Sequence, residues 1–97
     1  MITDGWIPQR AYATYTRRSP TGMLLETYHD GYEINETGVF IWSRVGSGVT
    51  VGQIVEQVAE AYSVDTALAA SAVHDFLTVL VERGFIEQAE GEADAAE

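Results

Sequence analysis

Few side chains in this sequence have the type and the spacing that catalysis requires. The chain contains two histidines and no cysteine, which excludes a thiolate nucleophile, a disulfide and a zinc–thiolate site. His29 falls in an expected turn and His74 on the polar face of an expected helix, and we interpret each as a surface residue. Asp75 follows His74, but neighbouring helical residues point about 100° apart and do not form a ligand pair. The sequence therefore predicts no catalytic residue, no metal site and no enzymatic activity.

Cofactor and nucleic-acid sites are also not indicated. The nine glycines are scattered and match no phosphate-binding loop or dinucleotide fingerprint, so we expect no cofactor. The chain has 15 acidic residues, five arginines and no lysine, which gives a net charge of −10. Nucleic-acid binding depends on lysine and arginine side chains that neutralise phosphates. A DNA or RNA partner is therefore not expected.

The charges are unevenly distributed along the chain. Residues 49–97 contain ten acids and only Arg83, whereas residues 1–48 contain five acids and four arginines. We interpret this acidity as a solvated surface. Arg17 and Arg18 lie beside an expected turn and could contact an acidic partner, although adjacent arginines are usually only solvated charge.

The length of 97 residues suits a single domain. We expect this domain over residues 11–87, with residues 1–10 as an N-terminal segment that packs loosely or frays. Residues 88–97 lack large apolar side chains and are predicted to be a disordered acidic tail. No apolar run approaches membrane-spanning length, and no basic segment leads into an apolar one at the N-terminus. We therefore expect a cytoplasmic protein without membrane association.

Three strands are predicted by β-favouring runs that alternate with turn signals. Residues 11–15 form the first expected strand, and residues 17–22 form a turn that contains proline and glycine. Residues 23–28 and 32–35 flank an Asp-Gly step, which predicts a β-hairpin over residues 23–35.

Two helices are expected directly after these strands. Asn35 has the residue type of an N-cap, and Gly46 or Gly48 has the type that ends a helix. Thr50 and Gln53 have the spacing of a capping box, and apolar residues then recur at helical spacing as far as Tyr62.

A third and longer helix has an unusually wide apolar face. Asp65 can cap a helix over Thr66–Arg83, which Gly84 ends, and Phe85 and Ile86 then fold back onto the core. The apolar side chains cover an arc of roughly 200°, about twice the width that one-sided packing needs. They are Ala72, Val73, Phe76, Leu77, Val79, Leu80 and Val81. This surplus of apolar surface predicts a partner.

Several short motifs lie along these elements. They are Gly31-Tyr-Glu-Ile-Asn-Glu-Thr-Gly38 leading into Phe40-Ile-Trp42, then Gly48-Val-Thr-Val51, Val73-His-Asp-Phe-Leu77, Leu80 and Gly84-Phe-Ile86. On these residues the chain resembles the PqqD-like family, also called RiPP recognition elements, over roughly residues 21–87. At this length it is similar to the standalone leader-binding protein of lasso peptide biosynthesis. The expected fold is α+β and winged-helix-like, with a three-stranded antiparallel sheet followed by three helices.

The resemblance implies a binding site for the leader peptide of a ribosomally made precursor. The leader would add a strand beside the third strand, with its register set by main-chain bonds to Tyr32, Glu33 and Ile34. The implied groove for its side chains consists of Val73, Phe76, Leu77, Val79 and Leu80. Core packing is the alternative for each of them and fits Val73 and Leu77 equally well, whereas Phe76 and Val79, toward one end of the arc, are the better site candidates. Arg83 would pair with an acidic leader residue, and Glu33 with a basic one. The residues point to the same place independently, because a short edge strand has unpaired N–H and C=O groups that can template another strand.

The implied role is delivery of a tethered peptide to a separate enzyme, which is a leader peptidase in the lasso case. One alternative keeps this binding mode but serves a radical-SAM peptide-modifying enzyme. Another is a structural adaptor that binds a folded partner through the same apolar surface. A winged-helix transcription factor would need basic residues on the third helix, where Arg83 is the only one.

Overall fold

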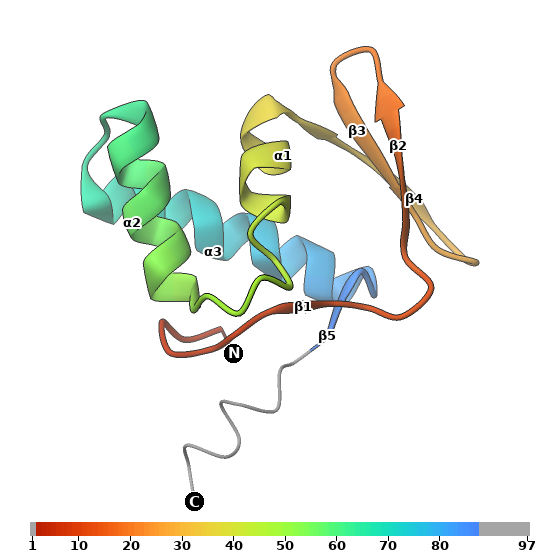
Figure 1. Ribbon diagram of the computed structural model, residues 1–97, viewed down its shortest axis with the longest axis horizontal. Helices are drawn as coiled ribbons and strands as arrows, with labels where there is room; N and C mark the ends of the chain where they lie inside the picture. The colour runs from red at the N-terminus through yellow and green to blue at the C-terminus, as the bar shows by residue number, and fades with distance from the viewer. Residues whose placement is uncertain (1, 88–97) are drawn as a thin grey trace, which may run out of the picture.

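The computed structural model describes residues 2–87, and Figure 1 shows how the elements are arranged. The strands are β1 (Gln9–Arg10), β2 (Tyr15–Ser19), β3 (Gly22–Glu26), β4 (Gly31–Asn35) and β5 (Ile86–Glu87). The helices are α1 (Glu36–Trp42), α2 (Val51–Tyr62) and α3 (Thr66–Glu82). None of these helices is long and apolar enough to cross a membrane. The predicted tail over residues 88–97 lies outside the described residues.

An antiparallel sheet of order β2-β3-β4 precedes the three helices. This arrangement confirms the predicted α+β, winged-helix-like fold. The hairpin expected over residues 23–35 is confirmed as β3 and β4, and Thr27 N–H donates to the carbonyl of Asp30 at 2.8 Å where the chain turns. In Figure 1 the sheet and α2 lie on opposite sides of the molecule, with α1 between them. β2 and β4 are the two edges of the sheet.

The first long strand is not where the sequence predicts it. The sequence predicts it over residues 11–15, but β2 covers Tyr15–Ser19 and includes Arg17 and Arg18, which the sequence places in the turn. The physical reason is register: Ser19 pairs with Gly22, so the turn contains only two residues and the strand extends up to it. Residues 11–14 instead connect β1 to β2, and Ala11 N–H donates to the carbonyl of Phe85 at 2.9 Å.

The N-terminal segment is part of the fold, so the expectation that residues 1–10 pack loosely or fray is wrong for residues 2–10. Trp6 is only 3% exposed and lies in the core. The carbonyls of Asp4 and Trp6 accept hydrogen bonds from Gly52 and Val51, at 2.9 and 2.8 Å. These are the first N–H groups of α2, which have no partner within their own helix. Farther along, β1 pairs antiparallel with β5.

The predicted caps are mostly confirmed. The side chain of Asn35 accepts a hydrogen bond from Gly38 N–H at 2.9 Å, and Thr50 forms a full capping box with Gln53. Asp65 occupies the N-cap position of α3, but its side chain makes no capping bond.

Two helix ends can be compared with the sequence. Gly84 has φ +86°, the left-handed geometry expected of the residue that follows α3. In contrast, α1 ends at Trp42, before either Gly46 or Gly48. The chain continues in turns over residues 43–48, where Gly46 and Gly48 have φ values of +91° and +89°.

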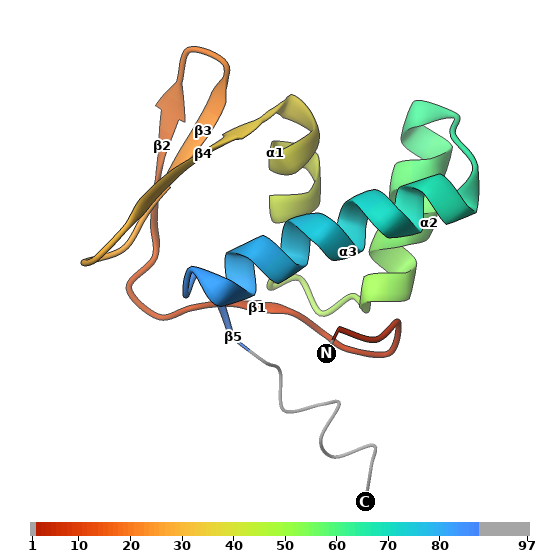
Figure 2. The ribbon, with the colours of Figure 1, turned by 180° about the vertical axis from the view of Figure 1, so that it is seen from behind.

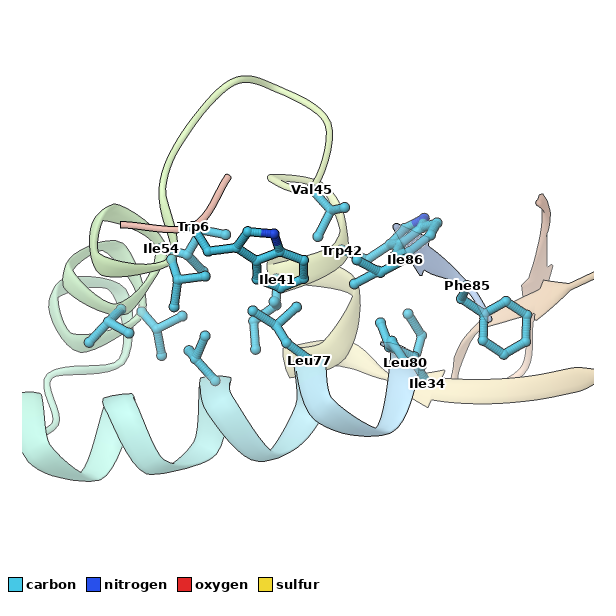
Figure 3. Packing of buried hydrophobic residues seen from close by; sticks show 14 of the residues in the cluster. Trp6, Ile34, Ile41, Trp42, Val45, Ile54, Leu77, Leu80, Phe85 and Ile86 are labelled. Atoms are coloured by element: carbon cyan, nitrogen blue, oxygen red, sulfur yellow. The ribbon is translucent and has the colours of Figure 1, made fainter. Parts of the chain in front are cut away.

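Part of the wide apolar face of α3 is used inside the molecule. Val73, Leu77 and Leu80 are completely buried. Figure 3 shows Leu77 and Leu80 pointing from α3 into the interior that also holds Ile41 and Trp42. The helix packs against α2 and β5, and Phe76 reaches α1. Phe76 and Val79 remain partly exposed, and Ala72 and Val81 are exposed. The core therefore uses three of the seven apolar residues, and the others remain accessible to a partner.

Candidate functional site

A small cleft lies at the free edge of β4, where the strand faces α3. Its volume is about 280 Å³, and its lining consists of Thr21, Tyr32, Glu33, Ile34, Asn35 and Phe76. Phe76 is contributed by α3, and the other residues come from β4 and the β2–β3 turn. The view from behind in Figure 2 shows α3 in front of α1, with β4 leading into α1. The structure thus brings Tyr32, Glu33 and Ile34 together with Phe76, as the sequence predicts.

The main chain of β4 is paired on one side only, because β3 is its single neighbour in the sheet. Thr27 N–H donates to Asp30 C=O, and the same register continues along the two strands. Hydrogen-bonded and non-hydrogen-bonded pairs alternate in an antiparallel ladder. This alternation directs the main-chain groups of Tyr32 and Ile34 toward β3 and those of Glu33 toward the free edge. Of the three predicted main-chain contacts, the one at Glu33 therefore has the required orientation.

The predicted groove residues separate into a buried group and a partly exposed group. Val73, Leu77 and Leu80 belong to the core and are 0% exposed, so they lie beneath the cleft and do not line it. Phe76 and Val79 are partly exposed on α3. Three of the seven apolar residues on the predicted arc face the core. Of the predicted groove residues, Phe76 and Val79 are the two that a ligand can reach.

The position of the Phe76 ring depends on Gly38 in α1. A Cβ atom at Gly38 would lie 3.1 Å from Cε1 of Phe76 and 2.9 Å from Cβ of Ile34. Contacts this short are unfavourable for any residue with a side chain. Glycine at this position therefore allows α1, β4 and the Phe76 ring to approach one another.

Arg83 lies beside Tyr32 at one end of the cleft and makes contacts within the chain. Its Nη1 atom lies 3.1 Å from Oδ2 of Asp30, in the β3–β4 turn. The guanidinium carbon is 4.6 Å from the ring centre of Tyr32, and that ring stacks on Phe85 with centroids 6.4 Å apart. The predicted pairing of Arg83 with an acidic ligand residue would therefore compete with Asp30.

The opposite end of the cleft carries a negative charge on Glu33. Hydroxyl groups of Ser19 and Thr21 lower the pKa of Glu33, and this effect outweighs desolvation. Thr21 Oγ1 donates to Oε2 of Glu33 at 2.9 Å. The carboxylate is therefore ionised at neutral pH and is placed to meet a basic group.

Three residues at or beside the cleft were not predicted as site residues. Thr21 and Asn35 line the cleft, and Gly38 supports it from α1. The sequence marks Thr21 as a turn residue and Asn35 as an N-cap, and both assignments are correct. Their second role depends on the turn and the cap meeting at the same end of β4, which no local pattern shows.

The rings of the two histidines each contact one side chain, and neither residue belongs to the cleft. His74 Nε2 lies 3.2 Å from Oδ1 of Asp4, and the exposed His29 ring packs edge-on against Tyr28. Across residues 2–87, no three histidine or acidic side chains gather into a group that could hold a metal ion.

The sequence matches the model of one protein family, described as "Coenzyme PQQ synthesis protein D (PqqD)", over residues 22–86. The chain belongs to the PqqD family. This range contains β3, β4 and the three helices, and therefore every residue of the cleft except Thr21. The resemblance inferred from the sequence motifs is confirmed. No curated protein sequence matches the chain.

Three solved structures share the fold of this PqqD-family protein. A lasso peptide synthetase B1 complexed with its leader peptide has a TM-score of 0.75 and 18% identity, over 84% of this chain and 98% of that one. TbiB1 in complex with the TbiA(β) leader peptide has a TM-score of 0.73 and 22% identity, over 81% and 94%. The PqqD part of Methylobacterium extorquens PqqCD, described as a stand-alone RiPP recognition element, has a TM-score of 0.76 and 17% identity, over 90% and 95%.

Proposed function

We propose that this protein binds the leader peptide of a ribosomally made precursor and presents it to a separate processing enzyme. The observation that carries the proposal is the cleft between the free edge of β4 and Phe76. It offers an unpaired strand edge beside an apolar side chain, which are the two parts required for recognition by strand addition. Membership of the PqqD family and the two structural neighbours solved with leader peptides support the same function.

The leader would lie in extended form along β4, hydrogen-bonded to the main chain of Glu33. Successive side chains of a strand point to opposite faces. One set would therefore lie beside Tyr32 and Phe76, continuing toward Val79, and the other beside the carboxylate of Glu33. A matching leader would carry apolar residues on the first face and a basic residue opposite Glu33.

In this role the protein carries out no bond chemistry of its own. By holding the leader, it would raise the concentration of the attached peptide at the enzyme. We propose a leader peptidase of lasso peptide biosynthesis as that enzyme, with a radical-SAM peptide-modifying enzyme as the alternative. The cytoplasm is the proposed location, because a ribosomally made precursor is available there.

The test is a fluorescence titration with the leader peptide of the nearest encoded small precursor. Binding at micromolar dissociation constants or tighter is expected, weakened about tenfold or more by Phe76→Ala and by Tyr32→Ala. Leu68→Ala is the matched control, because Leu68 is an α3 residue that is 60% exposed and does not line the cleft. Circular dichroism would verify that each variant is folded. If the wild-type protein does not bind the leader and binds only folded partners, it is instead an adaptor.

A further inference from the structure

A second and larger cavity lies toward the β2 edge of the sheet, opposite to the free edge of β4. Its volume is about 670 Å³, and it is bounded by the β2–β3 hairpin and by α1. Thr16, Arg18 and Met23 line it from the hairpin, and Glu36 and Val39 line it from α1. It shares only Thr21 with the cleft described above. The two cavities are therefore separate surfaces that flank the same hairpin.

The strand β2 that borders this cavity is the second free edge of the sheet. It pairs with β3 on one side, and four of its five residues are exposed. Arg18 is opposite Met23, and Thr16 is opposite Leu25, so Thr16 and Arg18 share the face of the sheet that borders the cavity. An extended segment added along β2 would place every second side chain over this cavity.

Arg18 differs from the other arginines in having no partner within residues 2–87. Arg10 contacts Trp42, Arg17 pairs with Glu26, Arg44 bonds to Gln57 and Arg83 pairs with Asp30. Arg18 makes no hydrogen bond, ion pair or ring contact with the described residues, and it forms no ion pair with Glu36 across the cavity. In a chain of net charge −10, it is a free guanidinium beside a cavity, with the geometry that binds a carboxylate through two parallel hydrogen bonds.

The charges also indicate which kind of segment fits. Antiparallel pairing of β2 with β2 of a second copy, centred on Arg17, would place the two Arg17 residues opposite one another, and like charges in that position are destabilising. A partner strand with acidic side chains would instead be attracted to Arg18. A protein that delivers a peptide needs such a second surface, because the leader would already occupy β4.

We propose that β2 and its adjoining cavity form a second docking site, which binds an extended acidic segment of the processing enzyme through Arg18. The assignment to the processing enzyme rests on the proposed function, whereas the preference for an acidic strand rests on the edge, the cavity and the free arginine. The protein would then hold the leader at one edge of its sheet and the enzyme at the other.

The first test uses the full, 15N-labelled chain and a synthetic ten-residue peptide in which glutamate alternates with valine and threonine. A peptide with lysine in place of each glutamate is the control. We expect the acidic peptide to shift the amide resonances of Thr16, Arg18 and Met23 and to leave that of Phe76 unchanged. Arg18→Glu should weaken binding about tenfold or more, and Arg18→Lys less, since lysine keeps the charge but not the two-pronged geometry. Equal binding of both peptides, or an unaffected Arg18→Glu variant, would overturn the proposal.

The second test separates this site from the leader site. Titration with the leader peptide should shift Glu33 and Phe76 but not Thr16 or Arg18, and Arg18→Glu should bind the leader normally. Shifts of Thr16 and Arg18 by the leader would show that the precursor itself occupies the cavity, which contradicts the assignment to the enzyme. Failure of the leader to bind anywhere would refute the proposed function while leaving the result with the acidic peptide intact.

The third test uses the enzyme encoded beside the same precursor gene, titrated calorimetrically against the leader-loaded protein. Its affinity should fall about tenfold or more with Arg18→Glu. An enzyme that binds wild-type and variant equally well would overturn the proposal.

Discussion

The ring of Phe76 lies directly over Gly38, so that a Cβ atom at position 38 would be 3.1 Å from Cε1 of the ring. This contact joins α3 to α1 at the edge of the cleft. It makes the shape of the candidate site dependent on a residue that no ligand would touch.

Gly38→Ala should destabilise the protein although alanine favours helices. The helical gain of about 1 kcal/mol is opposed by overpacking, which typically costs about 1 to 3 kcal/mol. We expect a net loss of up to about 2 kcal/mol in the free energy of unfolding, measured by urea denaturation, together with weaker leader binding as the Phe76 ring moves. Gly5→Ala is the control, because a Cβ at Gly5 meets no atom within 4 Å. A stabilised Gly38→Ala variant would show that the ring and α1 separate without cost.

Trp6→Ala tests whether the N-terminal segment belongs to the fold. Trp6 is 3% exposed, and its loss should lower the free energy of unfolding by about 3 to 5 kcal/mol. Tyr12, by comparison, is 93% exposed, and Tyr12→Ala should change stability by less than about 0.5 kcal/mol. Thermal and urea denaturation would measure both. Similar, small effects of the two substitutions would mean that the segment is only loosely attached in solution.

The two helix caps provide a matched pair. Thr50 makes both bonds of a capping box, whereas Asp65 makes no side-chain cap bond. Thr50→Ala should therefore cost about 1 kcal/mol of stability. Asp65→Ala should cost less, since only a favourable charge near the start of α3 is lost. The order of the two unfolding free energies decides this prediction, and a larger loss at Asp65 would contradict it.

The lowered pKa of Glu33 predicts a dependence on acid pH. A carboxyl group whose pKa is lower in the folded state stabilises the fold above its unfolded pKa, and this contribution is lost as the pH falls through the folded value. The loss should begin below about pH 4.3, the usual glutamate pKa. NMR titration of the Glu33 carboxyl should give a pKa below the ordinary value, and Thr21→Val should raise it, since the hydroxyl of Thr21 lowers the pKa. An unchanged pKa in Thr21→Val would leave Ser19 as the main cause.

The features that the sequence predicts correctly are those with local physical causes. The hairpin over residues 23–35 follows from an Asp-Gly step between β-favouring runs, and the caps at Asn35 and Thr50 depend on residues at most three positions away. Gly84 is identified by its place after a long helix. Each of these signals depends on residues that are close together in the sequence, so it does not depend on how the elements pack.

Other features depend on which elements meet, and only the tertiary structure decided them. The sequence shows a wide apolar arc on α3, but which part remains exposed depends on where α1, α2 and β5 pack. That packing buries Val73, Leu77 and Leu80 and leaves Phe76 at the cleft. The pairing of β1 with β5 joins segments more than 70 residues apart. The N-terminal segment that buries Trp6 also accepts hydrogen bonds from the first N–H groups of α2. Side-chain periodicity specifies the faces of an element, whereas the identity of the neighbour on each face is set by long-range packing.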